Sequence, residues 1–264
     1  MNKIGVIFIC LATIPCFIGC KLIKIEVSDK RNQSPQIVRP DNNIEVTSTG
    51  LTRISGTDFF PSGFRILEND KLIYIDPLAL NDTGRADYIF ITHQHLDHFS
   101  IKDIKKILKP GTIIICPESV ADKLRRYDYT IKEVKPGDSL DLDDNLTVEV
   151  IAAYNLHNAL LWLKAHPESK QNAGYILNID CIRIYHTGDS DYVPEMESIL
   201  DINLILVPIG GDNLTMNADD AARLVNHIKP DFAVPMHYET GENNGIERFR
   251  MLVDKNTSVL LLQE

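Results

Sequence analysis

The stretch Ile89-Phe90-Ile91-Thr92-His93-Gln94-His95-Leu96-Asp97-His98 is the most informative part of this sequence. It begins as a hydrophobic strand and runs directly into three histidines and an aspartate within six positions. Neutral imidazole and carboxylate groups are suitable ligands for zinc and for neighbouring divalent ions. Alternate residues of an extended chain point to the same side, so His93 and His95 can bind one ion while Asp97 and His98 reach a second. A histidine-rich surface loop is the alternative interpretation.

Strand-like and helical patterns surround this stretch on both sides. Ser100 is placed to cap a helix in which Ile101, Ile104 and Leu108 share one face, and Pro110-Gly111 ends it. Strands are expected at 44–48, 64–68, 71–75, 88–92, 112–116, 147–153, 174–179, 182–186, 204–208, 232–235 and 258–262. Further helices are expected near 118–126, 194–200, 217–228 and 247–254. Two β-rich halves, each followed by helices, predict an α/β sandwich with paired sheets inside and helices outside.

Composition and charge narrow the class of protein. The chain has 264 residues, of which 44% are hydrophobic and 24% charged, and this suits one globular domain after a short leader. It carries 27 Lys and Arg against 37 Asp and Glu, a formal net charge of −10. Because binding to a phosphate backbone needs an excess of cationic side chains, we expect no nucleic-acid partner.

The N-terminal residues look like a bacterial secretory signal with a lipobox. Met1 to Lys3 is basic, Ile4 to Ile18 is apolar, and Cys20 follows a small residue, although Phe17 stands where leucine is usual. An uncleaved membrane anchor is the alternative, but the run is shorter than the ~20 residues of a typical spanning helix. Both interpretations predict an exported, membrane-anchored protein on the periplasmic or cell-surface side, attached through the leader or a lipidated Cys20.

Three segments follow from this division of the chain. Residues 1–20 are predicted to be a lipoprotein-type signal peptide. Residues 21–43 are polar, contain Pro35 and Pro40, and are predicted to be a tether, so that the globular domain covers 44–264. Within that domain Cys116 and Cys181 are expected to be buried free thiols, in preference to a disulfide.

The histidine-rich stretch resembles the signature of the metallo-β-lactamase superfamily, and the resemblance extends from Ile44 to the C-terminus. Two downstream segments match the family's remaining metal-binding segments, namely Ile184-Tyr-His-Thr-Gly188-Asp189 and Val234-Pro-Met-His237-Tyr238. The motif Pro208-Ile-Gly-Gly211 with Thr215-Met216 is similar to the branch that contains L-ascorbate-6-phosphate lactonase and related hydrolases. The phospholipase D that cleaves N-acyl-phosphatidylethanolamine is a more distant relative. The resemblance implies a four-layer αββα sandwich.

The resemblance also implies a set of ligands for two divalent metal ions. Zinc is the first candidate, and manganese or iron are the alternatives. His93 and His95 would bind the first ion, and Asp97, His98 and His237 the second. Asp189 would bridge the two ions.

One ligand of the first ion stays open at this point. The family supplies a third histidine after the strand expected at 147–153, but Tyr154 or Asn155 stands there in this chain. His157 and His166 lie on the loop that follows, and His166 is the stronger candidate as a ligand or as a contact to substrate. If neither binds metal, the first site is open or weakly occupied.

Two other residues allow more than one interpretation. Asp76 ends a predicted strand before Pro77, so it either orients a ligand histidine or only caps the turn. Trp162, the only tryptophan, lies in the apolar run 159–163. It is interpreted as a packed side chain, with a lid over the substrate or a contact to the bilayer as alternatives.

The predicted reaction is hydrolysis of an ester-type bond (a phosphoester, phosphodiester or lactone) by a metal-bound hydroxide. Asp97 would orient the water or accept its proton, and a histidine or tyrosine between Tyr154 and His166 would protonate the leaving group. A small-molecule or lipid-derived substrate is expected. The alternative is a non-catalytic, metal-binding surface lipoprotein that captures a ligand or partner.

Overall fold

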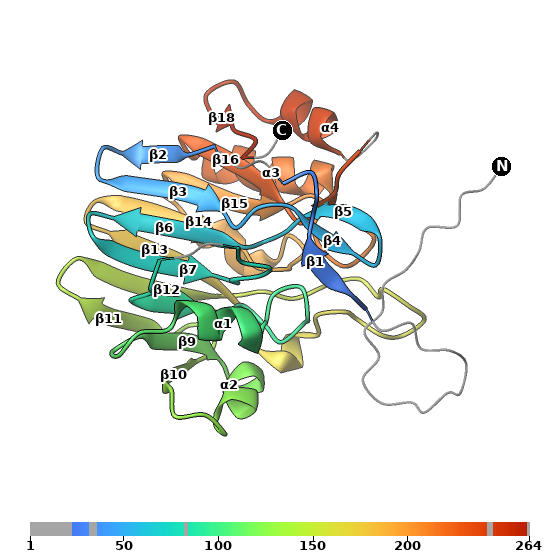
Figure 1. Cartoon of the computed structure of the whole chain (residues 1–264). Coiled ribbons are helices and arrows are strands. Elements are labelled where there is room, and N and C mark those ends of the chain that lie inside the picture. Colours follow the sequence, from blue (N-terminus) through green and yellow to red (C-terminus); the bar gives the residue numbers. More distant parts are fainter. Residues whose placement is uncertain (1–22, 32–35, 82–83, 242–244, 263–264) are drawn as a thin grey trace, which may run out of the picture.

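A computed structural model describes residues 23–31, 36–81, 84–241 and 245–262 (Figure 1). The predicted signal peptide and Cys20 lie outside the described residues. Two seven-stranded sheets pack face to face, and side chains from both, such as Ile66 and Phe90 of one and Leu177 of the other, belong to one buried cluster. Helices cover the outer faces of both sheets, which confirms the predicted α/β four-layer sandwich.

The first sheet has the strand order β10-β9-β8-β7-β6-β3-β2. It is antiparallel from β2 to β7 and parallel from β7 to β10. Parallel neighbours need crossover connections, and the two helices that cover this sheet lie in such connections. The elements are β2 (Val38–Asp41), β3 (Ile44–Ser48), β6 (Phe64–Glu68), β7 (Lys71–Ile75), β8 (Tyr88–Phe90), α1 (Ile101–Ile107), β9 (Ile113–Pro117), α2 (Glu118–Leu124) and β10 (Thr130–Val134).

The second sheet repeats this plan with the order β11-β12-β13-β14-β15-β16-β18. It is antiparallel from β11 to β14 and parallel from β14 to β18. The segment expected as a helix near 194–200 is a short 3-10 helix, η2. The elements are β11 (Ser139–Asp143), β12 (Leu146–Ala152), β13 (Ala173–Ile179), β14 (Ile182–His186), η2 (Pro194–Ser198), β15 (Leu204–Pro208), α3 (Ala218–Ile228), β16 (Phe232–Met236), α4 (Ile246–Leu252) and β18 (Ser258–Val259). A 3-10 helix, η1 (Glu168–Lys170), precedes β13.

Local sequence explains these elements well. All five residues of β15 are buried, as expected for a parallel strand covered on both faces. The predicted cap of α1 is confirmed, since Ser100 Oγ accepts a hydrogen bond from the Asp103 amide at 3.2 Å. The helix α3 begins at a capping Asn217 and buries Ala221, Leu224 and Ile228 against the sheet.

A third, four-stranded sheet has the order β1-β4-β5-β17 and stands at the edge of the sandwich. Its strands are β1 (Ile25–Val27), β4 (Thr52–Ile54), β5 (Thr57–Phe60) and β17 (Tyr238–Glu239). The sequence patterns did not predict this sheet, because strands of two to four residues leave too little alternation to recognise.

The segment expected to be a polar tether differs from that expectation over its described residues. β1 pairs with β4, and β2 pairs with β3 of the first sheet. The Arg31 guanidinium donates hydrogen bonds to three backbone carbonyls, those of Leu51, Ala79 and Gly50, at 2.8–3.0 Å. Backbone pairing and this arginine therefore bind the segment to the domain, although its side chains are mostly polar.

Two smaller expectations have different outcomes. Cys116 and Cys181 are both free, as predicted, but only Cys116 is buried, because Cys181 lies in the turn between β13 and β14.

Within the described ranges, no helix has the length and apolar character needed to cross a membrane.

Candidate metal centre

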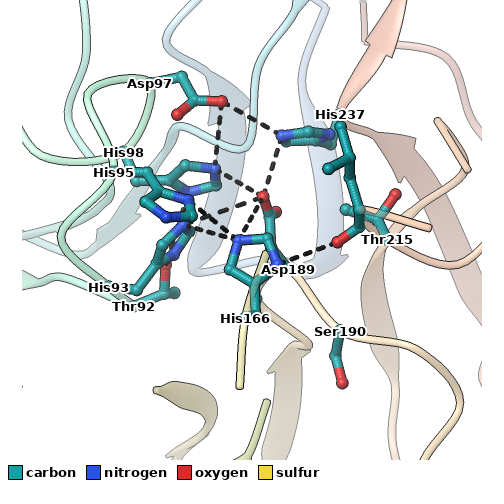
Figure 2. A network of polar contacts seen from close by, with 12 residues as sticks. Thr92, His93, His95, Asp97, His98, His166, Asp189, Ser190, Thr215 and His237 are labelled. Carbon is teal, nitrogen blue, oxygen red and sulfur yellow. Dashed lines mark hydrogen bonds and ion pairs between the residues drawn. The ribbon is translucent and has the colours of Figure 1, made fainter. Parts of the chain in front are cut away.

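The site lies at one edge of the two facing sheets, where the parallel strands end. β8 leads through Thr92 into His93, β14 leads into Asp189, and β16 leads into His237. Because the carboxyl ends of parallel strands meet at the same edge of a sheet, residues far apart in the sequence converge there. Figure 2 shows this convergence, with the imidazoles of both halves facing the Asp189 carboxylate.

Three histidines form the first group of candidate ligands, and His166 is one of them. Its Nε2 lies 3.2 Å from His93 Nε2 and 3.1 Å from His95 Nδ1. Tetrahedral ligands with zinc–nitrogen bonds of 2.0–2.1 Å stand about 3.3 Å apart, so this spacing suits a shared cation. By contrast, the His157 side chain is 69% exposed and its Nδ1 lies 3.2 Å from Asp191, outside the group.

The second group combines Asp97, His98, Asp189 and His237. Asp189 Oδ2 lies 3.1 Å from His98 Nε2 and 3.0 Å from His237 Nε2. Asp97 Oδ2 lies 3.8 Å from His98 Nε2 and 3.4 Å from His237 Nε2. The ligand atoms within each of the two groups all lie within 4.8 Å of one another.

Asp189 stands between the two groups. Its Oδ2 is 3.7 Å from His166 Nε2 and 4.0 Å from His93 Nε2, in addition to its close contacts in the second group. One carboxylate within reach of both sets of imidazoles is the arrangement that a bridging ligand requires. Seven of the candidate ligands named from the sequence are therefore brought together, and His157 is the one that is not.

The Asp76 carboxylate supports His98 and also closes the turn. Its Oδ2 accepts hydrogen bonds from His98 Nδ1 at 2.7 Å and from Thr92 Oγ1 at 2.6 Å, while Oδ1 accepts from the Thr92 amide at 2.8 Å. Thr92 Oγ1 in turn lies 2.9 Å from His93 Nδ1. The Nδ1 atoms of both histidines thus have acceptors, so the other ring nitrogens, Nε2, face the cluster.

Asn155 orients the His166 ring through a hydrogen bond, as Asp76 orients that of His98. The sequence patterns did not reveal this role. Its Oδ1 accepts hydrogen bonds from the His166 amide at 2.9 Å and from His166 Nδ1 at 3.0 Å. Its Nδ2 donates to the Leu214 carbonyl at 3.0 Å, which fixes the orientation of the amide. Asn155 therefore positions the histidine that reaches the cluster from further along the loop.

Tyr154, the other residue considered for this place, faces away from the cluster. Its hydroxyl lies 3.1 Å from Glu195 Oε2 and 3.3 Å from Oε1. Burial, followed by the hydrogen bond to Glu195, raises the pKa of Tyr154 to about 12. The hydroxyl is therefore a poor proton donor to a leaving group, which corrects one of the expectations for this loop.

Electrostatics divide the two groups. Burial lowers the pKa of His93 well below its ordinary value, lowers that of His95, and lowers the pKa of His166 to about 3. Burial also opposes a charge on His98 and His237, but Asp189 outweighs it. The pKa of His98 is raised well above its ordinary value and that of His237 to about 9. The first group is thus neutral at pH 7, whereas the second holds protons.

The same balance between burial and nearby charges sets the pKa of Asp189. Burial tends to raise the pKa of Asp189, but His237 and His98 outweigh burial and lower it well below its ordinary value. Two buried polar atoms, His98 Nε2 and Asp189 Oδ1, have no hydrogen-bond partner within the described structure. Converging lone pairs, two carboxylates and unsatisfied buried atoms fit divalent cations, which would replace the protons of His98 and His237.

A pocket of about 280 Å³ opens over the cluster. Five of the candidate ligands line it, namely His95, Asp97, His166, Asp189 and His237. Apolar side chains from the small sheet and two loops form much of the remaining wall: Ile23, Ile25, Ile54, Phe59, Leu96 and Leu163. Asp212 also lines the pocket.

Gly210 explains why the motif before this pocket contains glycine. A Cβ at Gly210 would stand 2.3 Å from the backbone oxygen of His237. No side chain fits there without moving the backbone that carries a candidate ligand. Phe59 packs on the other side, with its ring edge-on to the His237 ring at 4.9 Å between centroids.

Comparison with known proteins agrees with this geometry. A family model described as a beta-lactamase superfamily domain matches residues 57–238. A UPF0173 metal-dependent hydrolase of Archaeoglobus fulgidus is 31% identical over 195 residues, covering 66% of this chain and 79% of its own. Another from Staphylococcus aureus strain JH9 is 30% identical over 187 residues, covering 65% and 80%. The crystal structure of a candidate metal-dependent hydrolase from Parabacteroides distasonis matches with a TM-score of 0.70 and 24% identity, covering 87% and 98% of the two chains.

The fold and the His/Asp cluster define a metal-dependent hydrolase of the metallo-β-lactamase superfamily, as the sequence predicted. More narrowly, the chain belongs to that superfamily together with the UPF0173 metal-dependent hydrolases, to which it is similar over about two thirds of its length.

Proposed function

We propose that this protein hydrolyses an ester-type bond at a pair of divalent metal ions, most simply zinc. The observation that carries the proposal is the position of Asp189, whose carboxylate is within 4.0 Å of imidazoles from both ligand groups beneath an open pocket. His93, His95 and His166 would hold one ion, Asp97, His98 and His237 the other, and Asp189 both. A bound pair of this kind lowers the pKa of a water ligand to about 7 and polarises the oxygen atoms of the substrate.

Asp97 is the residue best placed to handle the proton of the attacking water. Its side chain is 28% exposed, whereas that of Asp189 is 2% exposed. Burial tends to raise the pKa of Asp97, but His98 and His237 outweigh burial and lower it, so the group is a carboxylate at neutral pH. As an ionised and partly exposed carboxylate, it can accept a hydrogen bond from the water and so orient it for attack.

His166 is better assigned as a ligand than as a general acid. Its Nδ1 lies 3.0 Å from both Asn155 Oδ1 and the Leu214 carbonyl, and its Nε2 faces His93 and His95. A ring with both nitrogens engaged in this way has no proton to give to a leaving group. The expected catalytic role of His166 is therefore replaced here by a role in metal binding.

The wall of the pocket supports a lipid-derived ester over a small phosphorylated one. Lys164 is the one lysine or arginine among the described residues that line it, whereas apolar side chains are numerous. A free phosphate group is usually recognised by several cationic or amide donors. An ester with an apolar substituent matches this lining. We retain the exported, membrane-anchored location as part of the proposal, because a protein in that place would meet such compounds.

Metal analysis combined with a substrate panel tests the proposal. We expect the purified, zinc-loaded chain to hold two ions and to hydrolyse members of a panel of phosphodiesters, lactones and carboxylic esters. Asp97→Asn should lower kcat about 10²–10⁴-fold, the usual contribution of a general base. Asp212→Asn is the matched control, because Asp212 lines the pocket but belongs to neither ligand group. One ion or none, without turnover, would favour a non-catalytic metal-binding protein instead.

A further inference from the structure

An exposed apolar hairpin stands beside the mouth of the pocket. Its strands close through hydrogen bonds between Leu163 N and the Leu160 carbonyl at 2.8 Å and between Ala159 N and the Leu163 carbonyl at 2.8 Å. The tip consists of Leu161 and Trp162, which are 72% and 77% exposed. Packing, the preferred expectation for Trp162, is therefore wrong.

The backbone of the tip makes this exposure more unusual. Leu161 has a φ of +51°, in the left-handed region that glycine or asparagine occupies more easily. This conformation costs free energy for a leucine, and burial of the side chain does not offset the cost because the side chain lies in solvent. Asn158 Nδ2 donates to the Leu161 carbonyl at 3.1 Å and helps to hold the turn in this shape.

The base of the hairpin belongs to the pocket wall, together with the first described residue of the chain. Leu163, Ala159 and Ile23 all line the pocket over the metal centre, and so does Leu96, which is 50% exposed. We call the apolar residues around this opening the mouth face: Ile23, Leu96, Leu161, Trp162 and Leu163. In Figure 1 the yellow loop that carries the hairpin projects beyond the sheets on the side where β1 begins.

The distance along the chain from the predicted anchor to this face is short. Three residue steps separate Cys20 from Ile23, and five separate the end of the apolar run at Ile18 from Ile23. A fully extended chain spans at most ~3.6 Å per residue, so either form of anchor keeps the pocket opening within roughly 20 Å of the bilayer. A tether of the expected length would have allowed any face to meet the membrane, but β1 removes that freedom.

Charge beside the mouth face favours the same partner. A groove that shares Ile23 and Leu96 with the mouth face is also lined by Lys24, Lys102 and Lys123. The same groove contains a fourth lysine and two carboxylates, namely Lys106, Glu26 and Asp103, of which Glu26 pairs with Lys24 at 2.6 Å and Asp103 with Lys106 at 2.8 Å. Four lysines against two carboxylates leave this groove net positive, although the whole chain has a formal net charge of −10. Apolar and aromatic side chains flanked by lysines are typical of surfaces that insert into the interface of a bilayer with anionic lipids.

We propose that the mouth face rests on the phospholipid bilayer, with Leu161 and Trp162 inserted at the level of the headgroups, so that the pocket opens toward the membrane lipids. This orientation rests on the predicted anchor and on the geometry of the mouth face, and it goes beyond the proposed hydrolysis. It also gives a route by which an apolar substrate enters the pocket without crossing water.

The single tryptophan makes the test direct, because the protein's tryptophan emission comes from Trp162 alone. The full chain is reconstituted into vesicles of phosphatidylcholine and phosphatidylglycerol whose acyl chains carry bromine, and its emission is compared with that in unbrominated vesicles. We expect blue-shifted emission, loss of more than half of the intensity in brominated lipid, and protection from aqueous acrylamide.

A matched probe on the other side of the molecule provides the control. Cys181 is exposed in the turn at the far end of β14, roughly 20 Å of strand away from the site. In the Trp162→Phe, Cys181→Trp double variant we expect no quenching by brominated lipid and full quenching by acrylamide.

Two results would overturn the proposal. Equal quenching by acrylamide of Trp162 and of the tryptophan at position 181 would show that the hairpin lies in water. Protection of Trp162 from acrylamide without quenching by the lipid would mean that protein, such as a second copy of the chain, covers the hairpin. The readout needs neither metal nor turnover, so failure of the hydrolase proposal would leave this test unaffected.

Discussion

Replacement of Asp76 by asparagine tests how the metal centre is held. The carboxylate is fully buried and makes three hydrogen bonds of 2.6–2.8 Å, two to Thr92 and one to His98 Nδ1. Asparagine keeps the shape and the acceptor for the Thr92 amide, but it places an NH₂ group opposite His98 Nδ1. The neutral form of His98, which is the form that binds metal, then keeps its remaining proton on Nε2, the atom that should face the cation.

The magnitude follows from this loss. Removal of the carboxylate partner of a ligand histidine typically lowers metal affinity 10- to 100-fold, or about 1.4–2.7 kcal/mol. One effect acts in the opposite direction, because Asp76 contributes to the raised pKa of His98, and a lower pKa makes that proton easier to displace. We expect the net result to lie near tenfold for the second ligand group, with little change in the first.

The assay is a zinc competition titration against a chromophoric chelator, with thermal unfolding of the metal-free protein measured in parallel. Asp103→Asn is the matched control, since its buried carboxylate accepts hydrogen bonds from the amides of Ala79 and Leu80 but contacts no candidate ligand. Both variants should lose stability, and only Asp76→Asn should lose affinity. Zinc affinity within twofold of the unaltered protein in Asp76→Asn would refute the reasoning.

Three further predictions concern the same centre. Asn155→Leu removes the acceptor of His166 Nδ1, so zinc affinity of the first group should fall about tenfold; an unchanged titration would show that the Leu214 carbonyl alone suffices. At pH 7 the second group should release protons on binding zinc, because the pKa of His237 is raised to about 9 and that of His98 is raised as well, whereas the neutral first group should release none. The zinc affinity of the second group should therefore weaken as pH falls. Calorimetry in two buffers of different ionisation enthalpy measures the protons released, and a value of zero would contradict this prediction. His157→Ala should leave metal content and turnover unchanged, since that side chain is 69% exposed, and a loss of one ion would reinstate it as a ligand.

The sequence determined the framework of the site because its signals are local. Short buried strands, the Ser100 cap and the histidine-rich turn each depend on neighbours within a few residues, so they can be recognised without knowing the fold. The six ligands named for the two ions, from His93 to His237, follow from spacing and family resemblance, and the structure brings them together. Strands of only two to four residues, such as β1 and β4, carry no comparable signal.

Only the tertiary structure decided how the open positions are filled. Whether His157 or His166 joins the first ligand group depends on where the loop folds back. The hydrogen bonds from His166 to Asn155, eleven positions earlier, place His166 there. The two possible roles of Asp76 are both present, because the same carboxylate reaches the turn and the His98 ring. The place of β1 in the pocket wall and the exposure of Trp162 likewise depend on long-range packing, whose free energy is set by which surfaces meet and not by any short pattern in the chain.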